Sequence, residues 1–241
     1  FDRLRTNGGG GVEIRPDQPF TRFPPRPTIS NPAGKMEPPS LPPSISDLPL
    51  RLTLDGDALA ANWRLLDRLS GGAACGAAVK ADGYGLGAHE VTQRLADAGC
   101  RDFFVATWAE AVTLGALPQG AALSVLHGVR EADMAAALTG IARPVLNTAA
   151  QVARWKQAAV GRPCDVMVDT GMNRLGLTPQ EATSGLLDGL SIDTLMSHLA
   201  CADEPESPLN DRQRDAFRAI ADVVPAPRRS LWNSAGIFHR G

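Results

Sequence analysis

One lysine in this sequence has the surroundings of a reactive amine. Lys80 directly follows a short apolar run, Cys75–Val79, whereas the other two lysines, Lys35 and Lys156, fall in a proline-rich stretch and in a helical pattern. Partial burial at the end of an apolar strand favours the neutral form of an amine, which is a nucleophile toward aldehydes. These residues predict a site that binds a carbonyl compound covalently; a solvated loop lysine is the alternative.

A group suited to a phosphate lies near this lysine. Tyr84, the one tyrosine of the chain, stands four residues after Lys80, among glycines that let the backbone approach a bound group. A tyrosine hydroxyl is an ordinary phosphate ligand. The predicted chemistry is therefore the binding of an anionic group close to a reactive amine.

Short apolar runs separated by helical patterns must position these residues. The runs have strand length, and they are Cys75–Val79, Phe103–Thr107, Leu123–His127, Arg143–Asn147, Asp165–Asp169, Thr194–Ser197 and Arg229–Trp232. Strands that alternate with helices imply right-handed crossovers and a parallel sheet. We predict an α/β fold of the TIM type, a (β/α)8 barrel with about seven of its eight strands present, in which functional residues gather at the carboxyl ends of the strands. An open doubly wound sheet is the alternative, but the G-x-G-x-x-G turn typical of it does not follow the first run.

The ends of individual elements carry local signals. Leu50–Leu54 has the composition of a short strand, and Asp57 is predicted to cap the helix that follows. The sequence Thr178–Glu181 predicts a helix start with a capping box and a proline in the first turn. Asn210–Val223 is predicted to form a helix with one apolar face.

Composition and charge exclude several classes of partner. The formal net charge of −2 favours neither a nucleic acid nor an anionic membrane surface as a partner. No apolar run approaches the roughly 20 residues that a membrane-spanning helix needs. The four cysteines, at positions 75, 100, 164 and 201, form no Cys-x-x-Cys pair. They are predicted to be buried free thiols in a reducing cytoplasm, and no metal site is predicted.

The first 47 residues differ in composition from the rest. They hold four consecutive glycines, Gly8 to Gly11, and many prolines. Such a stretch cannot bury enough apolar surface to offset its ordering entropy, so we expect residues 1–47 to be disordered and residues 48–241 to form the barrel domain. Because the chain begins with Phe1, Met36 is a candidate for the native start.

Four segments, in this order, resemble segments of the alanine racemase family. They are Val79–Gly87, Asp169–Gly176, Ser197–Glu204 and Asn233–Gly236, each at the end of a predicted strand. The resemblance covers about residues 50–241. It implies a barrel domain that binds pyridoxal 5′-phosphate and a protein that interconverts L-alanine and D-alanine.

The resemblance also implies a role for each residue of the site. Lys80 binds the cofactor as an imine and is one of two bases that take or return the α-proton of the substrate imine. Tyr84 and Ser234 donate to the phosphate, with Asn233 beside them in the cofactor site. His198 packs against the pyridine ring, and Arg174 lies beside the phenolic oxygen of the cofactor.

Three parts of the family's machinery are expected outside these 241 residues. They are the eighth strand, an arginine that faces the pyridine nitrogen, and the second base, a tyrosine from the second domain of a partner subunit. We therefore expect this polypeptide alone to fold poorly and not to racemise alanine. The parent protein is expected to be a homodimer in a bacterial cytoplasm. Its product, D-alanine, is expected to be used for peptidoglycan. A non-catalytic cofactor carrier, an amino-acid decarboxylase and a racemase of broader range remain alternatives.

Several residues depart from the family pattern or have structural interpretations. Met167 takes a position where many members carry a carbamylated lysine that helps to place the arginine, and Leu86 takes one that is often histidine. His127 is predicted to be structural. Asp169 either caps its loop or acts in the site. The pair Arg228-Arg229 is predicted to lie on a solvated face at the opposite mouth of the barrel.

Overall fold

The computed structural model describes residues 52–240, with side chains up to Phe238. The predicted disorder of residues 1–47, the domain start at residue 48 and the candidate start at Met36 lie outside the described residues. The described residues belong to one compact unit. None of their helices is long and apolar enough to cross a membrane.

A seven-stranded parallel sheet forms the centre of the described chain, and the order of its strands in space follows their order in sequence. The strands are β1 (Ala77–Ala78), β2 (Asp102–Val105), β3 (Ala122–Val125), β4 (Arg143–Leu146), β5 (Pro163–Met167), β6 (Ser191–Met196) and β7 (Arg228–Ser230). Every pair of neighbours is parallel. This confirms the seven predicted strands. It contradicts the doubly wound alternative, in which the strand order reverses within the sheet.

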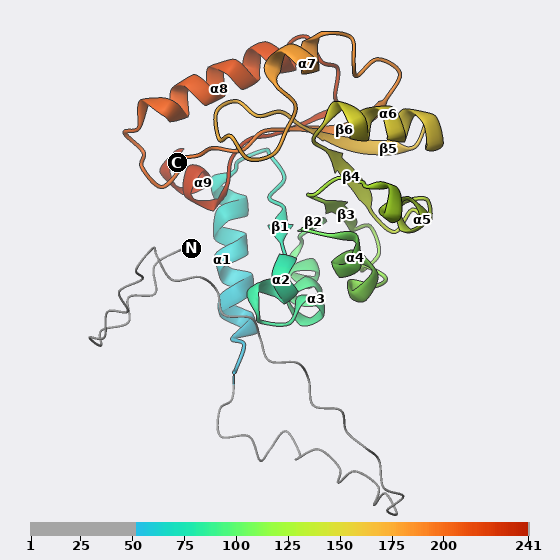
Figure 1. Cartoon of the computed structure of the whole chain (residues 1–241). Helices are drawn as coiled ribbons and strands as arrows, with labels where there is room; N and C mark the ends of the chain where they lie inside the picture. The colour runs from blue at the N-terminus through green and yellow to red at the C-terminus, as the bar shows by residue number, and fades with distance from the viewer. Residues whose placement is uncertain (1–51, 241) are drawn as a thin grey trace, which may run out of the picture. The chain divides into compact units, whose positions relative to one another are not determined.

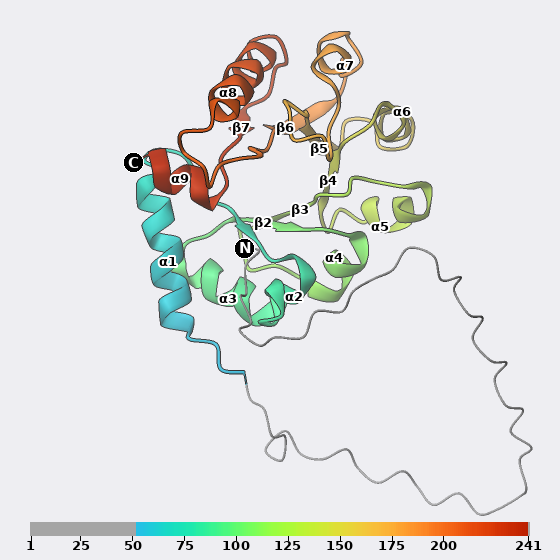
Figure 2. The ribbon, with the colours of Figure 1, turned by 60° about the vertical axis from the view of Figure 1, so that its left-hand side comes forward.

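Helices connect the strands and lie around the outside of the curled sheet (Figures 1 and 2). They are α1 (Gly56–Leu69), α2 (Lys80–Tyr84), α3 (Ala88–Ala98), α4 (Trp108–Leu114), the 3₁₀ helix η2 (Glu131–Asp133), α5 (Met134–Ala137), α6 (Ala149–Ala158), α7 (Pro179–Thr183), α8 (Pro208–Ala221) and α9 (Ser234–Arg240). Helix α1 packs against α3 and against α9. The arrangement is that of an incomplete TIM-type barrel, as the sequence predicts.

Burial alternates along β2. On β2, Phe103 and Val105 are almost completely buried, whereas Asp102 and Phe104 between them are only partly buried. Burial of one large apolar side chain contributes about 1.5–3 kcal/mol to stability. Buried apolar side chains such as these therefore help to hold the sheet in place.

Two predicted element starts are wrong, and two are confirmed. Residues 52–55 form no strand, and Leu52 is 72% exposed. Asp55, rather than Asp57, caps α1, because its carboxylate accepts a hydrogen bond from the N–H of Ala58 at 2.9 Å. Helix α7 begins with the predicted capping box of Thr178 and Glu181, and α8 forms within two residues of the predicted bounds.

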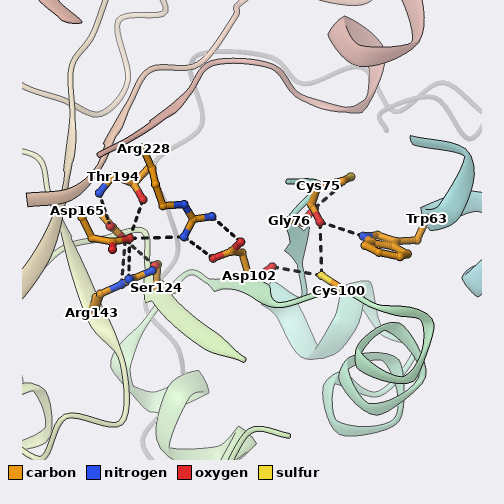
Figure 3. Close-up of polar contacts among 11 residues, drawn as sticks. Trp63, Cys75, Gly76, Cys100, Asp102, Ser124, Arg143, Asp165, Thr194 and Arg228 are labelled. Carbon is orange, nitrogen blue, oxygen red and sulfur yellow. Dashed lines mark hydrogen bonds and ion pairs between the residues drawn. The ribbon is translucent and has the colours of Figure 1, made fainter. Parts of the chain in front are cut away.

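A group of ion pairs, here called the amino-end charge cluster, lies where the strands begin (Figure 3). Its members are Asp102, Arg143, Asp165, Asp193 and Arg228. Arg228 on β7 makes two hydrogen bonds, of 2.8 and 2.5 Å, to the carboxylate of Asp102 on β2. Arg143 lies 2.7 Å from Asp193. As predicted, Arg228 and Arg229 lie at the amino ends of the strands; Arg229 is exposed, and the side chain of Arg228 is 39% exposed while it pairs with Asp102.

Asp165 is the fully buried member of this cluster. Burial raises the pKa of its carboxyl, although the positive charge of Arg143 and hydrogen bonds from Ser124 and Thr194 oppose that shift. The hydroxyl of Ser124 donates to it at 2.5 Å and the N–H of Thr194 at 3.1 Å. Neighbouring donors thus partly compensate the burial of this charge.

All four cysteines are free, as predicted. Cys75, Cys100 and Cys164 are buried, and Cys201 is partly buried. The indole N–H of Trp63 donates to the carbonyl of Cys75, which joins α1 to the chain before β1 (Figure 3). Burial raises the pKa of both Cys100 and Cys164 to about 12, so neither thiol is reactive at neutral pH.

Candidate functional site

The candidate residues lie at the carboxyl ends of four parallel strands. Lys80 comes directly after the residue that follows β1, and His198 comes shortly after β6. Arg174 lies in the loop after β5, and Ser234 begins α9 after β7. Because parallel strands end at the same edge of a sheet, these positions share one end of the incomplete barrel.

Three of these residues act on one another electrostatically. The pKa of His198 is lowered, first by burial and then by the positive charges of Arg174 and Lys80. A histidine whose pKa lies below the ordinary value of 6.5 is neutral at neutral pH. The structure therefore brings Lys80, Arg174 and His198 close together, with a neutral imidazole at His198.

Tyr84 also belongs to this group. The amine nitrogen of Lys80 lies 5.9 Å from the centre of the Tyr84 ring. Lys80 is partly buried, whereas Tyr84 is 59% exposed. The phenol is thus accessible to a ligand that reaches the lysine.

A left-handed turn carries both residues. In α2, the φ angles are 52° at Ala81, 52° at Asp82, 63° at Gly83 and 57° at Tyr84. The left-handed conformation costs a non-glycine residue about 1–2 kcal/mol. Such strain persists only where surrounding contacts hold it, and it is typical of functional sites.

Glu110 on α4 holds this turn from outside and was not singled out from the sequence. One carboxylate oxygen accepts a hydrogen bond from the N–H of Ala81 at 2.9 Å. The other accepts from Ala106 at 2.6 Å and Thr107 at 3.1 Å. Burial alone would raise the pKa of Glu110, but these three donors leave it lowered. The capping box Thr107-x-x-Glu110 was visible in the sequence, whereas the contact to Ala81 was not.

Asp169 organises the loop that carries Arg174. Its carboxylate accepts hydrogen bonds from the N–H groups of Gly171 and Met172 at 2.8 Å and of Arg174 at 3.2 Å. Burial would raise the pKa of Asp169, but backbone donors of this loop leave it lowered. Of the two interpretations left open for Asp169, the structure supports the cap.

Gln213 on α8 joins the loops after β5 and β6 and is a second residue that sequence reasoning missed. Its side chain is completely buried. Its amide oxygen accepts from the N–H of Ala200 at 2.8 Å, and its amide nitrogen donates to the carbonyl of His198 at 3.0 Å and to Thr170 at 3.4 Å. A polar residue on a helical face gives no sequence signal for such contacts.

For the other residues discussed from the sequence, the structure gives fewer contacts with Lys80, Arg174 and His198. The side chain of Asn233 accepts a hydrogen bond from the N–H of Gly236 at 3.0 Å, so it caps α9. Ser234 is exposed at the same end of the sheet. Met167 is partly buried at the end of β5, beside Met196 of β6, and Leu86 is 38% exposed. His127 lies close enough to Glu110 for its charge to help lower the pKa of that carboxyl.

The donor set at this end of the barrel fits an anionic carbonyl compound. An amine, a guanidinium, an accessible phenol and a neutral imidazole lie at this end, on loops whose backbone groups are held by the side chains of Glu110, Asp169 and Gln213. Among residues 52–240 there is no group of three or more histidine, cysteine, aspartate or glutamate side chains that could hold a metal ion. The fold and the site define a barrel protein of the α/β class with a lysine-centred site at the carboxyl ends of its strands.

Comparison with known proteins assigns the family. The sequence profile described as "Alanine racemase, N-terminal domain" matches residues 54–240. The chain belongs to the alanine racemase family.

Individual relatives agree with this assignment. Alanine racemase of Rhodospirillum rubrum is 47% identical over 198 residues, which is 78% of this chain and 53% of the relative. A protein named "Alanine racemase, catabolic" from Mesorhizobium japonicum is 42% identical over 197 residues, 78% of this chain and 52% of the relative. The chain thus spans about half the length of the curated relatives it matches.

A solved structure shows the same fold. It is the alanine racemase from Bartonella henselae with covalently bound pyridoxal phosphate, which is 32% identical and superposes with a TM-score of 0.70. The match covers 76% of this chain and 54% of that chain. The bound cofactor is a property of that protein.

Proposed function

We propose that this chain binds pyridoxal 5′-phosphate through Lys80 and that the protein containing it interconverts L-alanine and D-alanine. The observation that carries the proposal is the meeting of Lys80, Arg174 and His198 at the carboxyl ends of the strands. Family membership and the printed names of the relatives support it. The cofactor in the Bartonella henselae structure supports the choice of ligand.

Each residue of the site has a proposed role in holding the cofactor. The amine of Lys80 would hold it through its aldehyde carbon, and the hydroxyls of Tyr84 and Ser234 would donate to its phosphate, with Asn233 beside them. The guanidinium of Arg174 would lie at the phenolic oxygen, where a fixed array of donors suits an oxyanion. The neutral imidazole of His198 would pack against the ring without adding a positive charge.

The cofactor, when bound, withdraws electrons from the substrate so that its α-proton can be removed. Lys80 is then the base that takes or returns this proton on one face. For the other face we propose, from the family resemblance, a tyrosine outside these 241 residues. The thioether of Met167 cannot act as a carbamylated lysine would, and the backbone N–H of Arg174 donates to the carboxylate of Asp169.

Properties of the whole protein are proposals as well. We propose alanine as the substrate, a homodimer as the assembly and a bacterial cytoplasm as the location, with D-alanine for peptidoglycan as the use of the product. Relatives named as alanine racemases support the substrate. The prediction that this 241-residue polypeptide alone does not racemise alanine is tested by measuring D-alanine formation with it; appreciable turnover contradicts it.

Cofactor titration tests the central claim. We expect added pyridoxal phosphate to give a near-visible absorption band, and borohydride reduction to fix the label on the peptide that contains Lys80. Lys80→Ala should abolish both signals, whereas Lys156→Ala on α6 should leave both unchanged. A band that survives Lys80→Ala, or a label on Lys156, would show that the assignment of the cofactor lysine is wrong.

A further inference from the structure

The turn after Lys80 is a strained segment that is held by local hydrogen bonds and by a contact from α4. Within the segment, the N–H of Gly83 donates to the carbonyl of Val79, and that of Gly85 donates to the carbonyl of Ala81, each at 2.9 Å. The carboxylate of Asp82 accepts from Ala88 at 2.8 Å. These bonds shape the turn but do not fix its place relative to the other strands.

Two hydrogen bonds join this segment to β2 and α4. Before Lys80, the N–H of Val79 donates to the carbonyl of Phe104 on β2 at 2.8 Å, and after Lys80, the N–H of Ala81 donates to Glu110 on α4. Ala81 follows Lys80 directly, and the bond from its N–H to Glu110 joins residues that are 29 positions apart in sequence. The second oxygen of Glu110 is bound to the N–H groups of Ala106 and Thr107, at the end of β2 and the start of α4. One carboxylate therefore connects the lysine turn to the end of the neighbouring strand.

We propose that Glu110 is a positioning residue for the cofactor lysine. Its carboxylate holds the left-handed turn against the end of β2 and thereby sets where the side chains of Lys80 and Tyr84 lie. Glu110 acts through the backbone of Ala81. The inference rests on the proposed function, because it takes Lys80 as the residue that binds pyridoxal phosphate.

A second glutamate in the chain provides a matched control. Glu181 occupies the same position in the capping box of α7 as Glu110 does in that of α4, and both side chains are partly buried. The carboxylate of Glu181 accepts from the N–H and the hydroxyl of Thr178, within its own cap. The two residues therefore share the capping role, and the bond to Ala81 distinguishes Glu110.

The experiment compares Glu110→Gln with Glu181→Gln in the full chain. A glutamine can accept through one oxygen only, and its NH2 group would face a backbone N–H. We expect Glu110→Gln to speed amide hydrogen exchange in residues 81–87 by about tenfold or more and to weaken pyridoxal phosphate binding by about tenfold. Glu181→Gln should leave both quantities within about twofold of the original chain, while it lowers the melting temperature as a lost cap does.

The outcomes separate this inference from the proposed function. Equal effects of the two variants on exchange in residues 81–87 would overturn the positioning role. If Lys80→Ala binds pyridoxal phosphate like the original chain, the proposed function fails, and the exchange comparison still decides the role of Glu110. Should Glu110→Gln not fold, Glu110→Asp replaces it: the shorter carboxylate cannot span Ala81 and Ala106, so the same local increase in exchange is expected.

Discussion

His198 shows most clearly how single residues set the electrostatics of this site. Burial and the positive charges of Arg174 and Lys80 all disfavour its protonated form, so its pKa is lowered. A neutral His198 adds no positive charge beside Arg174 and Lys80. The stability of the folded chain must then depend on pH through this residue.

The free energy of unfolding is expected to fall as the pH drops below 6.5, the ordinary pKa of histidine. The fall should end when the pH reaches the lower pKa of folded His198. Between these two values the unfolded chain binds more protons than the folded chain, so stability rises with pH there. Urea denaturation between about pH 5 and pH 8 measures the slope of the free energy of unfolding against pH. His198→Gln should reduce it, and His89→Gln, at an exposed position of α3, should not. An unchanged slope in His198→Gln contradicts the prediction.

At the scale of elements, α8 supports the site through one side chain. Gln213 satisfies the N–H of Ala200 and the carbonyl of His198, both in the segment after β6. It also reaches Thr170, whose hydroxyl lies 2.8 Å from that of Ser197. A helix on the outside of the barrel thus fixes two loops at its carboxyl end.

Gln213→Leu keeps the size of this buried side chain but leaves its backbone partners without a bond. We expect a loss of about 1–3 kcal/mol in the free energy of unfolding, measured by urea denaturation. Gln157→Leu, at an exposed position of α6, is the control and should change stability by less than about 0.5 kcal/mol. Equal losses in the two variants would show that the contacts of Gln213 carry no net stability.

The elements were predictable from the sequence to the extent that burial alone determines them. Each of the seven apolar runs overlaps a strand because its apolar side chains are buried under helices. The strand bounds were less predictable: β1, for example, ends before the predicted Val79. The cap of α1 was assigned to Asp57 rather than Asp55 because two nearby aspartates offer the same local signal in the sequence.

The site was less predictable than the strands. Ala81, Asp82 and Tyr84 adopt left-handed angles without being glycine, which no local rule predicts. The contact of Glu110 with Ala81 depends on the register of β1 against β2, a property of the assembled sheet.

At the scale of the whole molecule, the amino-end charge cluster links distant parts of the sheet. The pair of Arg228 and Asp102 joins residues 126 positions apart, on β7 and β2. Their side chains are 39% and 14% exposed, so solvent screens the pair only in part. We expect such a pair to stabilise the curled arrangement of the strands more than an ion pair on the surface does.

A double-mutant cycle with Arg228→Met and Asp102→Asn tests this link. We expect a coupling energy of about 1–3 kcal/mol from urea denaturation, after allowance for the exposure of Arg228. The control cycle uses Arg214 and Asp211 on α8, whose side chains are 31% and 71% exposed and which should couple by about 0.3–0.5 kcal/mol. A coupling between Arg228 and Asp102 no larger than this control contradicts the prediction.

The strand order has a consequence for how the chain reaches this structure. Every strand after β1 pairs with the strand synthesised immediately before it. As the polypeptide emerges from the ribosome, the sheet can therefore grow by one strand and one crossover at a time, without waiting for a distant partner. The bond between Asp102 and Arg228 is different, because it joins the second strand to the seventh and so forms late in synthesis.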